Sequence, residues 1–448
     1  MASAALPDNF LPLAQITRNA TITPVRDPFV QDFGHKFVNF GSCFAQNLKR
    51  ILDSFGLETF FLSEICAHYN TETLVNVLEI AADGRLPDRD DFISLDGKMW
   101  AYRQHFKYPF QSEAVVGPAL ERIAAMYDVL RKAVREADTF IITLGTSRVI
   151  RLRSNGAALA VGAGLPREYW QLDMLDVEQN VAHLRRMAAA ISSIRGGKPA
   201  NVVLTVSPQR YLFGHLFEEG QRRHEGVALV DNFLSKCYLR VAAQQVIDNP
   251  PPGLNFRYFP ALEIVLDELR PFESIAHYDY CHINQQHTPD LVVKKFLLTY
   301  ASEEILEQLS AATRIEALWA EVAKLRRGGL ATEDPEIVHS LDAVEEELDR
   351  FGDSLSGPLL NIRYHLLTEY KRPLKRLFYP FESPGNLNSA ARILAAVGRV
   401  SEAREVLERV MAHVGPRRTE DPEAGSSVEH AAFNEACALW NNLRAATA

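Results

Sequence analysis

The sequence lacks the features that mark several common classes of protein. Its five cysteines are scattered and form no Cys-x-x-Cys pair, which argues against a disulfide framework and against a zinc site. No apolar run approaches the ~18 residues of a membrane span, and the N-terminus has no basic, then apolar, signal-peptide pattern. The net charge of −9 argues against a nucleic-acid partner, because phosphate binding needs a basic surface. We therefore expect a cytoplasmic protein with no metal and no organic cofactor.

The 448 residues are enough for two or three domains. Residues 1–35 show little periodicity and are expected to form an arm on the first domain. Over 36–300, buried-strand patterns alternate with helical ones, which is typical of an α/β domain with a parallel sheet. The pattern then becomes helical, as an extension over 301–378 and a tetratricopeptide-like hairpin over 379–448. One hairpin is too few for a repeat array, so these helices are expected to serve packing or contact with a protein partner.

A strand–glycine–helix elbow organises the first domain. Residues 37–40 predict a short strand, Gly41 interrupts it, and a helical apolar stripe begins at Phe44. Two nucleophilic side chains, Ser42 and Cys43, therefore fall at the start of a helix. Unpaired N–H groups there carry partial positive charge, which can lower the pKa of a thiol and bind an oxyanion.

Two further apolar runs predict buried strands, over 138–145 and 201–208, that end in Gly145 and Ser207-Pro208. The carboxyl ends of parallel strands are where such sheets bind ligands. We expect the elbow to lie at the same edge.

A candidate acid–base pair follows late in this domain. Asp279 and His282 are three residues apart, so the carboxylate could orient the imidazole and leave its second nitrogen free to act as a base. His287 is a second candidate base. By itself the pair is also compatible with a polar turn.

The residues FGSCFA at 40–45 resemble the signature of the GSCFA family, which is grouped with the SGNH (GDSL-like) hydrolases. The resemblance covers about 36–300 and extends to several further segments: residues 142–149, residues 204–210, Asn232 with Ser235-Lys236, residues 258–263 and residues 267–270. It implies a three-layer, flavodoxin-like α/β domain followed by helices.

The resemblance also suggests roles at the elbow. Aligning Gly-Ser-Cys-Phe with the Gly-Asp-Ser-Leu of SGNH enzymes places Cys43 where their serine stands, and a shift by one residue restores Ser42. A thiolate is the better nucleophile near neutral pH. The alternative is that neither side chain reacts, with Ser42 capping the helix and Cys43 packing in the core.

The oxyanion hole of SGNH enzymes uses the nucleophile's N–H, a glycine N–H and an asparagine side chain. The residues that could supply these donors here are Asn70, Gly145 and Thr146. The chain departs from the family pattern, because Gly145 is followed by Thr-Ser and not by the expected asparagine. Arg148 and Arg210 could hold an anionic or sugar group, or form structural ion pairs.

These inferences leave two hypotheses for function. The first is an acyl-ester hydrolase or O-acyltransferase that acts on a glycan or another hydroxylated small molecule through Cys43 or Ser42, His282 and Asp279. The second is a non-catalytic binding or scaffold protein built on a degenerate hydrolase fold.

Overall fold

In the computed structural model, contacts divide the chain into two units. The first comprises 1–30, 35–51 and 59–300, and the second 31–34, 52–58 and 301–448. The structure describes residues 22, 26–27, 35–54, 57–95, 98–103, 116–160, 165–211, 228–269, 288–350, 362, 366, 388, 391–395, 400–418 and 435–443.

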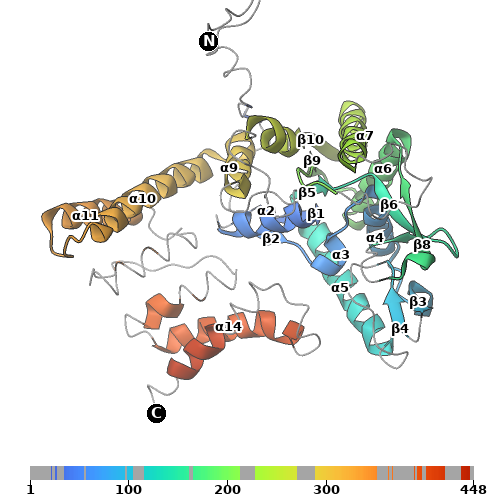
Figure 1. The fold of residues 1–448 in the computed structure, drawn as a ribbon. Coiled ribbons are helices and arrows are strands. Elements are labelled where there is room, and N and C mark those ends of the chain that lie inside the picture. The colour runs from blue at the N-terminus through green and yellow to red at the C-terminus, as the bar shows by residue number, and fades with distance from the viewer. Residues whose placement is uncertain are drawn as a thin grey trace, which may run out of the picture. The chain divides into compact units, whose positions relative to one another are not determined.

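The first unit is built around a five-stranded, all-parallel sheet flanked by helices, which confirms the predicted α/β fold (Figure 1). Its strands lie in the order β2-β1-β5-β9-β10, which in chain order is 2-1-3-4-5, the flavodoxin-like order. Their bounds are β1 (Phe37–Gly41), β2 (Thr59–Phe60), β5 (Thr139–Leu144), β9 (Ala200–Val206) and β10 (Leu254–Phe259).

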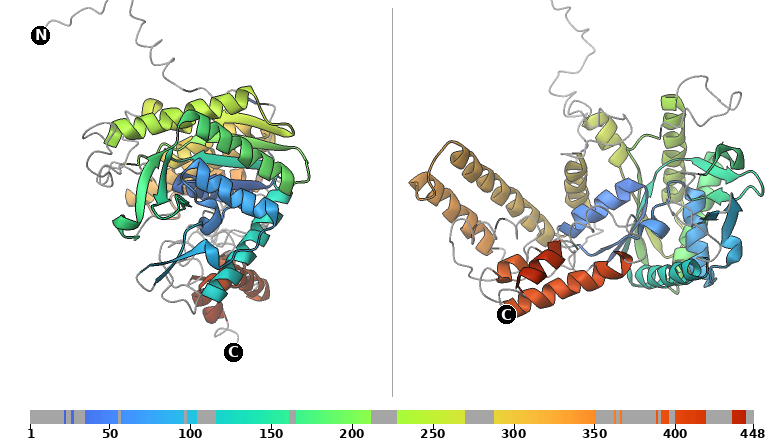
Figure 2. Two further views of the ribbon diagram at one scale, coloured as in Figure 1. Left: turned by 90° about the vertical axis from the view of Figure 1, so that its right-hand side faces the viewer. Right: turned by 60° about the horizontal axis from the view of Figure 1, so that its bottom comes forward.

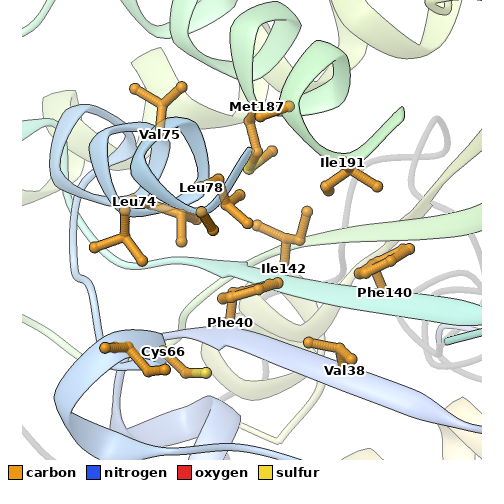
Figure 3. Close-up of a cluster of buried hydrophobic side chains, with 14 of the residues drawn as sticks. Val38, Phe40, Cys66, Leu74, Val75, Leu78, Phe140, Ile142, Met187 and Ile191 are labelled. Atoms are coloured by element: carbon orange, nitrogen blue, oxygen red, sulfur yellow. The ribbon is translucent and has the colours of Figure 1, made fainter. Parts of the chain in front are cut away.

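The central strands are apolar because both faces of the sheet are covered. Every residue of β5 is buried, and Ile142 pairs with Phe40 of β1 on one side and Leu204 of β9 on the other. Figure 3 shows side chains of α4 (Thr71–Asp83) and α6 (Val177–Ile194), among them Leu78 and Ile191, gathered against β5 in one continuous core. This packing fixes where the strand ends lie.

The helices of the first unit connect the strands, as predicted from their amphipathic patterns. They are α2 (Cys43–Ser54), α3 (Ser63–Cys66), α4 (Thr71–Asp83), α5 (Val116–Glu136), α6 (Val177–Ile194), α7 (Ala228–Asp248), α8 (Ala261–Glu263) continued by a π-helical turn (Ile264–Glu268), and α9 (Thr288–Tyr300).

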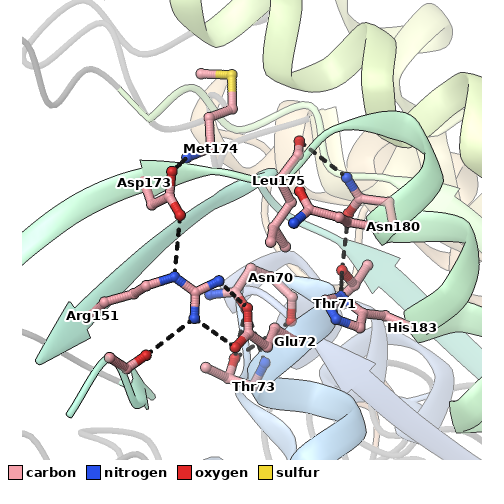
Figure 4. A network of polar contacts seen from close by, with 12 residues as sticks. Asn70, Thr71, Glu72, Thr73, Arg151, Asp173, Met174, Leu175, Asn180 and His183 are labelled. Carbon is pink, nitrogen blue, oxygen red and sulfur yellow. Dashed lines mark hydrogen bonds and ion pairs between the residues drawn. The ribbon is translucent and has the colours of Figure 1, made fainter. Parts of the chain in front are cut away.

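Two small antiparallel sheets stand apart from the central one. A hairpin joins β3 (Phe92–Leu95) to β4 (Lys98–Ala101), and β6 (Arg148–Leu152) pairs with both β7 (Ala158–Leu159) and β8 (Trp170–Met174). The sequence patterns did not predict the three-stranded sheet. An ion pair joins it to α4, because Arg151 donates to both carboxylate oxygens of Glu72 at 2.7 Å (Figure 4).

The described residues of the N-terminal arm bind the first unit at two points. The Ile22 N–H donates to Glu268, and Lys295 donates to the Ile22 carbonyl at 2.7 Å. Arg257 pairs with Asp27 at 2.6 Å. These contacts attach the arm to the π-helical turn, α9 and β10.

The second unit is helical. α10 (Glu303–Arg327) and α11 (Pro335–Arg350) lie side by side and share a core that includes Ile315, Leu341 and Leu348 (Figure 2). α14 (Val400–Arg418) packs in a separate core with residues 391–395 and 435–443. The turn of the hairpin expected over 379–448 lies outside the described residues. None of the helices described is long and apolar enough to cross a membrane.

Candidate functional site

The carboxyl ends of β1, β5 and β9 meet at one edge of the sheet. The chain leaves β1 toward β2 on one side and later returns as β5 on the other, so this is the point where the strand order reverses. Ser42, Gly145 and Ser207 each follow one of these strands directly. The structure thus brings the elbow and both predicted strand ends together.

Gly41 makes the close approach of β1 to β5 sterically feasible. Its φ is +123°, and a Cβ atom there would lie 2.0 Å from the carbonyl oxygen of Thr143. Any side chain would clash with that backbone, which itself pairs with Gly41 in the sheet. The glycine therefore lets the strand turn sharply into α2.

The hydroxyl of Ser42 serves the fold. Its Oγ is buried, accepts the Phe44 N–H at 3.3 Å as a helix cap, and lies 3.1 Å from Ser207 Oγ. Cys43 is the first residue of α2, and its side chain lies outside the described part of the structure. Asp279, His282 and the alternative base His287 also lie outside it.

Cys66 shows what an unreactive thiol looks like in this fold. It is fully buried in α3, and desolvation raises its pKa to about 12. The thiol therefore stays protonated at neutral pH and cannot act as a nucleophile there.

The oxygen and the nitrogen of the Asn70 side-chain amide differ in their contacts. Its side chain caps α4, with Oδ1 accepting the Thr73 N–H at 2.9 Å. This bond fixes the amide orientation, and within the described residues its Nδ2 has no hydrogen-bond partner. Thr71 is already helical, and its hydroxyl donates to Asn180 at 2.8 Å. Asn70 is thus both a cap and an available donor.

The other expected oxyanion donors are used inside the protein. The N–H groups of Gly145 and Thr146 both donate to the Tyr69 carbonyl, at 3.0 and 2.7 Å. The Thr146 hydroxyl accepts the Arg148 N–H and lies 3.0 Å from Ser235 Oγ. In this arrangement they hold the turn after β5 against the Tyr69-Asn70 segment and do not offer free hydrogen-bond donors.

Helix α7 supplies two residues whose contacts the sequence did not predict. Ser235 Oγ accepts the Ser147 N–H at 2.7 Å, and Lys236 donates to the Gly145 carbonyl. Lys236 is 2 % exposed, and its ammonium lies 4.9 Å from the centre of the Tyr211 ring. One signal could have found it: a lysine four residues after Asn232 and three before Leu239, on the buried face of the helix.

A buried network joins the turn after β5 to α4 and α6, and Figure 4 shows the part of it in which Thr71 contacts Asn180 and His183. Asn180 accepts from Thr71 and donates to Ser147 Oγ at 3.3 Å, and Ser147 Oγ donates to the Ser235 carbonyl. Thr71 Oγ1 also lies 3.1 Å from Nδ1 of His183, whose pKa is lowered by burial. The chain of bonds makes this edge of the sheet rigid.

The two candidate arginines occupy different surroundings. Arg148 is 2 % exposed, donates to the Tyr211 carbonyl at 3.0 Å and pairs with Asp231 at 3.5 Å. Burial lowers its pKa and Asp231 opposes this shift. A guanidinium so placed serves the fold. Arg210 is half-buried, three residues beyond Ser207.

Fold and site together define a flavodoxin-like α/β protein with polar residues gathered at the carboxyl ends of its strands. The family model for the GSCFA family matches residues 36–296, and the chain belongs to this family. Searches of curated proteins and of solved structures each found no match. Among the residues described, no cluster of histidine, cysteine and acidic side chains could hold a metal ion.

Proposed function

We propose that the protein is an SGNH-like acyl-ester hydrolase or O-acyltransferase with a small-molecule or glycan ester as its substrate. Cys43 is the nucleophile, His282 the base and Asp279 the residue that orients it. The observation that carries the choice of nucleophile is the capping role of Ser42, whose buried hydroxyl is already used by Phe44 and Ser207. Cys43 is left at the helix start, where the helix dipole favours a thiolate.

Asn70 supports the same chemistry from the start of α4, which lies next to the end of β5. Gly41 pairs with Thr143, and two residues later Gly145 binds the Tyr69 carbonyl, so Asn70 is held beside the end of β1. In the proposal its Nδ2 and the Cys43 N–H stabilise the oxyanion. Donors fixed in advance stabilise a developing charge without reorganisation.

The reaction runs in two steps. His282 takes the thiol proton, and Cys43 Sγ attacks the acyl carbonyl to form a thioester. The alcohol leaves with the proton from His282. Water or an acceptor hydroxyl, deprotonated in turn by His282, then attacks the thioester, releasing the acid or the new ester and restoring the thiol.

Acylation with 4-nitrophenyl acetate, followed by peptide mapping, tests the proposal. We expect the acetyl group on Cys43, and at least a ~100-fold slower nitrophenol burst in Cys43→Ala and His282→Ala. Ser42→Ala should still be acylated, with a loss of about 1 kcal/mol in stability. Cys66 serves as an internal control because its raised pKa keeps it unmodified. Unchanged turnover in both Cys43→Ala and His282→Ala would sink the mechanism.

One observation favours the alternative, a binding protein on a degenerate hydrolase fold. The Gly145 N–H and the Thr146 hydroxyl are both occupied within the protein. If wild-type protein is not acylated by any activated ester but binds a glycan ester without cleaving it, this second function is the correct one.

A further inference from the structure

Arg210 differs from the other buried and half-buried arginines described in the first unit. Within the described part of the chain it makes no hydrogen bond, ion pair or ring contact. Partners are found for the arginines Arg148, Arg151, Arg195 and Arg257. A half-buried guanidinium without a partner is poised to bind an anion, because its five donors match a carboxylate or phosphate.

The backbone on both sides of Arg210 is firmly held. Ser207 Oγ accepts the Gln209 N–H and lies 3.1 Å from Ser42 Oγ. On the other side, the Tyr211 N–H donates to Asn232 at 2.9 Å and its carbonyl accepts from Arg148. The Arg210 Cα is therefore fixed at the strand-end edge, while its side chain has no partner among the residues that the structure describes. A fixed backbone lowers the entropic cost of binding a ligand.

Neighbouring residues hold Tyr211 from two more sides. The Tyr211 ring lies 5.6 Å from the ring of Tyr69, the residue before the oxyanion donor Asn70, and it also faces the buried Lys236 ammonium. Arg210 thus belongs to the same edge as Asn70 and the start of α2.

The local charge also favours an anion. Among the described residues of this edge, Arg148, Lys236, Arg240 and Arg210 are positive. Asp231 and Glu263, which pair with Arg148 and Arg240, are negative, so the edge is positive on balance, whereas the whole chain carries a net charge of −9. A locally positive edge on an acidic protein concentrates anionic ligands there and keeps them off the rest of the surface.

We propose that the substrate carries a carboxylate or phosphate group and that Arg210 binds this group beside the reacting ester. The inference rests on the proposed function for the reaction, but anion binding itself does not depend on turnover. Arg210 acts as a specificity residue that selects anionic over neutral esters.

Two matched esters test the selection: 4-nitrophenyl hydrogen succinate and its neutral methyl ester. We expect wild-type protein to prefer the anionic ester by about tenfold in kcat/KM, as one ion pair of moderate strength allows. Arg210→Gln should reduce this preference to near one, and Arg210→Lys should restore part of it. Arg185→Gln is the control, because Arg185 is an exposed arginine in the middle of α6.

Calorimetric titration with succinate and with inorganic phosphate separates binding from catalysis and shows which anion fits. We expect binding by wild-type protein and by Arg185→Gln, and at least about fivefold weaker binding by Arg210→Gln. Anion binding without ester turnover would uphold this inference and refute the proposed function. Ester turnover with no anionic preference, or equal anion binding by wild-type and Arg210→Gln protein, would overturn the inference.

Discussion

At the scale of the residue, Gly41 is the position where space is tightest. A Cβ atom at Gly41 would lie 2.0 Å from a backbone oxygen, whereas one at Gly84, which also has a positive φ, would meet nothing within 4 Å. We expect Gly41→Ala to lower the free energy of unfolding by about 3 kcal/mol, because the clash adds to the backbone strain. Gly84→Ala should cost only about 1 kcal/mol, from strain alone.

Urea unfolding followed by circular dichroism measures both glycine variants. Equal losses in the free energy of unfolding for Gly41→Ala and Gly84→Ala would mean that β1 and β5 can separate enough to admit a methyl group. The steric account of the elbow would then be wrong.

Sequence patterns located the elbow but could not show that the Ser42 hydroxyl is used within the fold. A capping serine and an exposed serine at a helix start look the same in a sequence. The contact that reveals the role of Ser42 joins it to Ser207, which is 165 residues away. The same holds for Gly145, whose N–H is occupied by Tyr69 from another part of the chain.

At the scale of the element, Arg195 joins the ends of two helices. It is buried at the end of α6. It donates to the carbonyls of Val134, in the last turn of α5, and of Ala137, just after α5, and to those of Lys198 and Pro199 before β9. Arg195→Met keeps the length of the side chain and removes every donor. We expect the free energy of unfolding to fall by about 3 kcal/mol, because several buried carbonyls lose their hydrogen-bond donor.

Arg186→Met is the matched control for Arg195→Met in thermal and urea unfolding. Arg186 is also on α6 and pairs with Glu79 through two short bonds, but it is half exposed, so its loss should cost less than about 1 kcal/mol. A larger loss for Arg186→Met than for Arg195→Met would contradict this explanation.

The elements differ in how well the sequence predicted them. β5 and β9 are buried on both faces, and their unbroken apolar runs could be read directly. The three-stranded sheet was missed because its strands carry charged residues whose partners lie elsewhere. Arg151 of β6, for example, pairs with Glu72 of α4. Partners distant in sequence leave no local pattern to read.

At the scale of the whole molecule, contacts assign the short segment 52–58 to the second unit. Leu57 in this segment is completely buried. We expect Leu57→Ala to cost about 3 kcal/mol and to speed hydrogen exchange chiefly in residues 301–350. Leu204→Ala in β9, equally buried, should instead speed exchange in the central sheet.

Hydrogen exchange with mass spectrometry compares these two leucine variants. Faster exchange confined to the sheet strands in Leu57→Ala would show that the segment 52–58 belongs energetically to the first unit. Sequence patterns placed a boundary near 300 but gave no indication of this segment, because its grouping depends on contacts across more than two hundred residues.

The double duty of Asn70 has an evolutionary consequence. Aspartate, serine and threonine cap a helix about as well as asparagine does, but among them only asparagine also offers an amide N–H₂. Selection for stability alone would thus tolerate any of the four at this position. A relative with aspartate, serine or threonine here would keep the helix and lose the donor. Under the proposed mechanism, substitution at position 70 in a relative would therefore indicate that the relative keeps the fold and has lost the proposed chemistry.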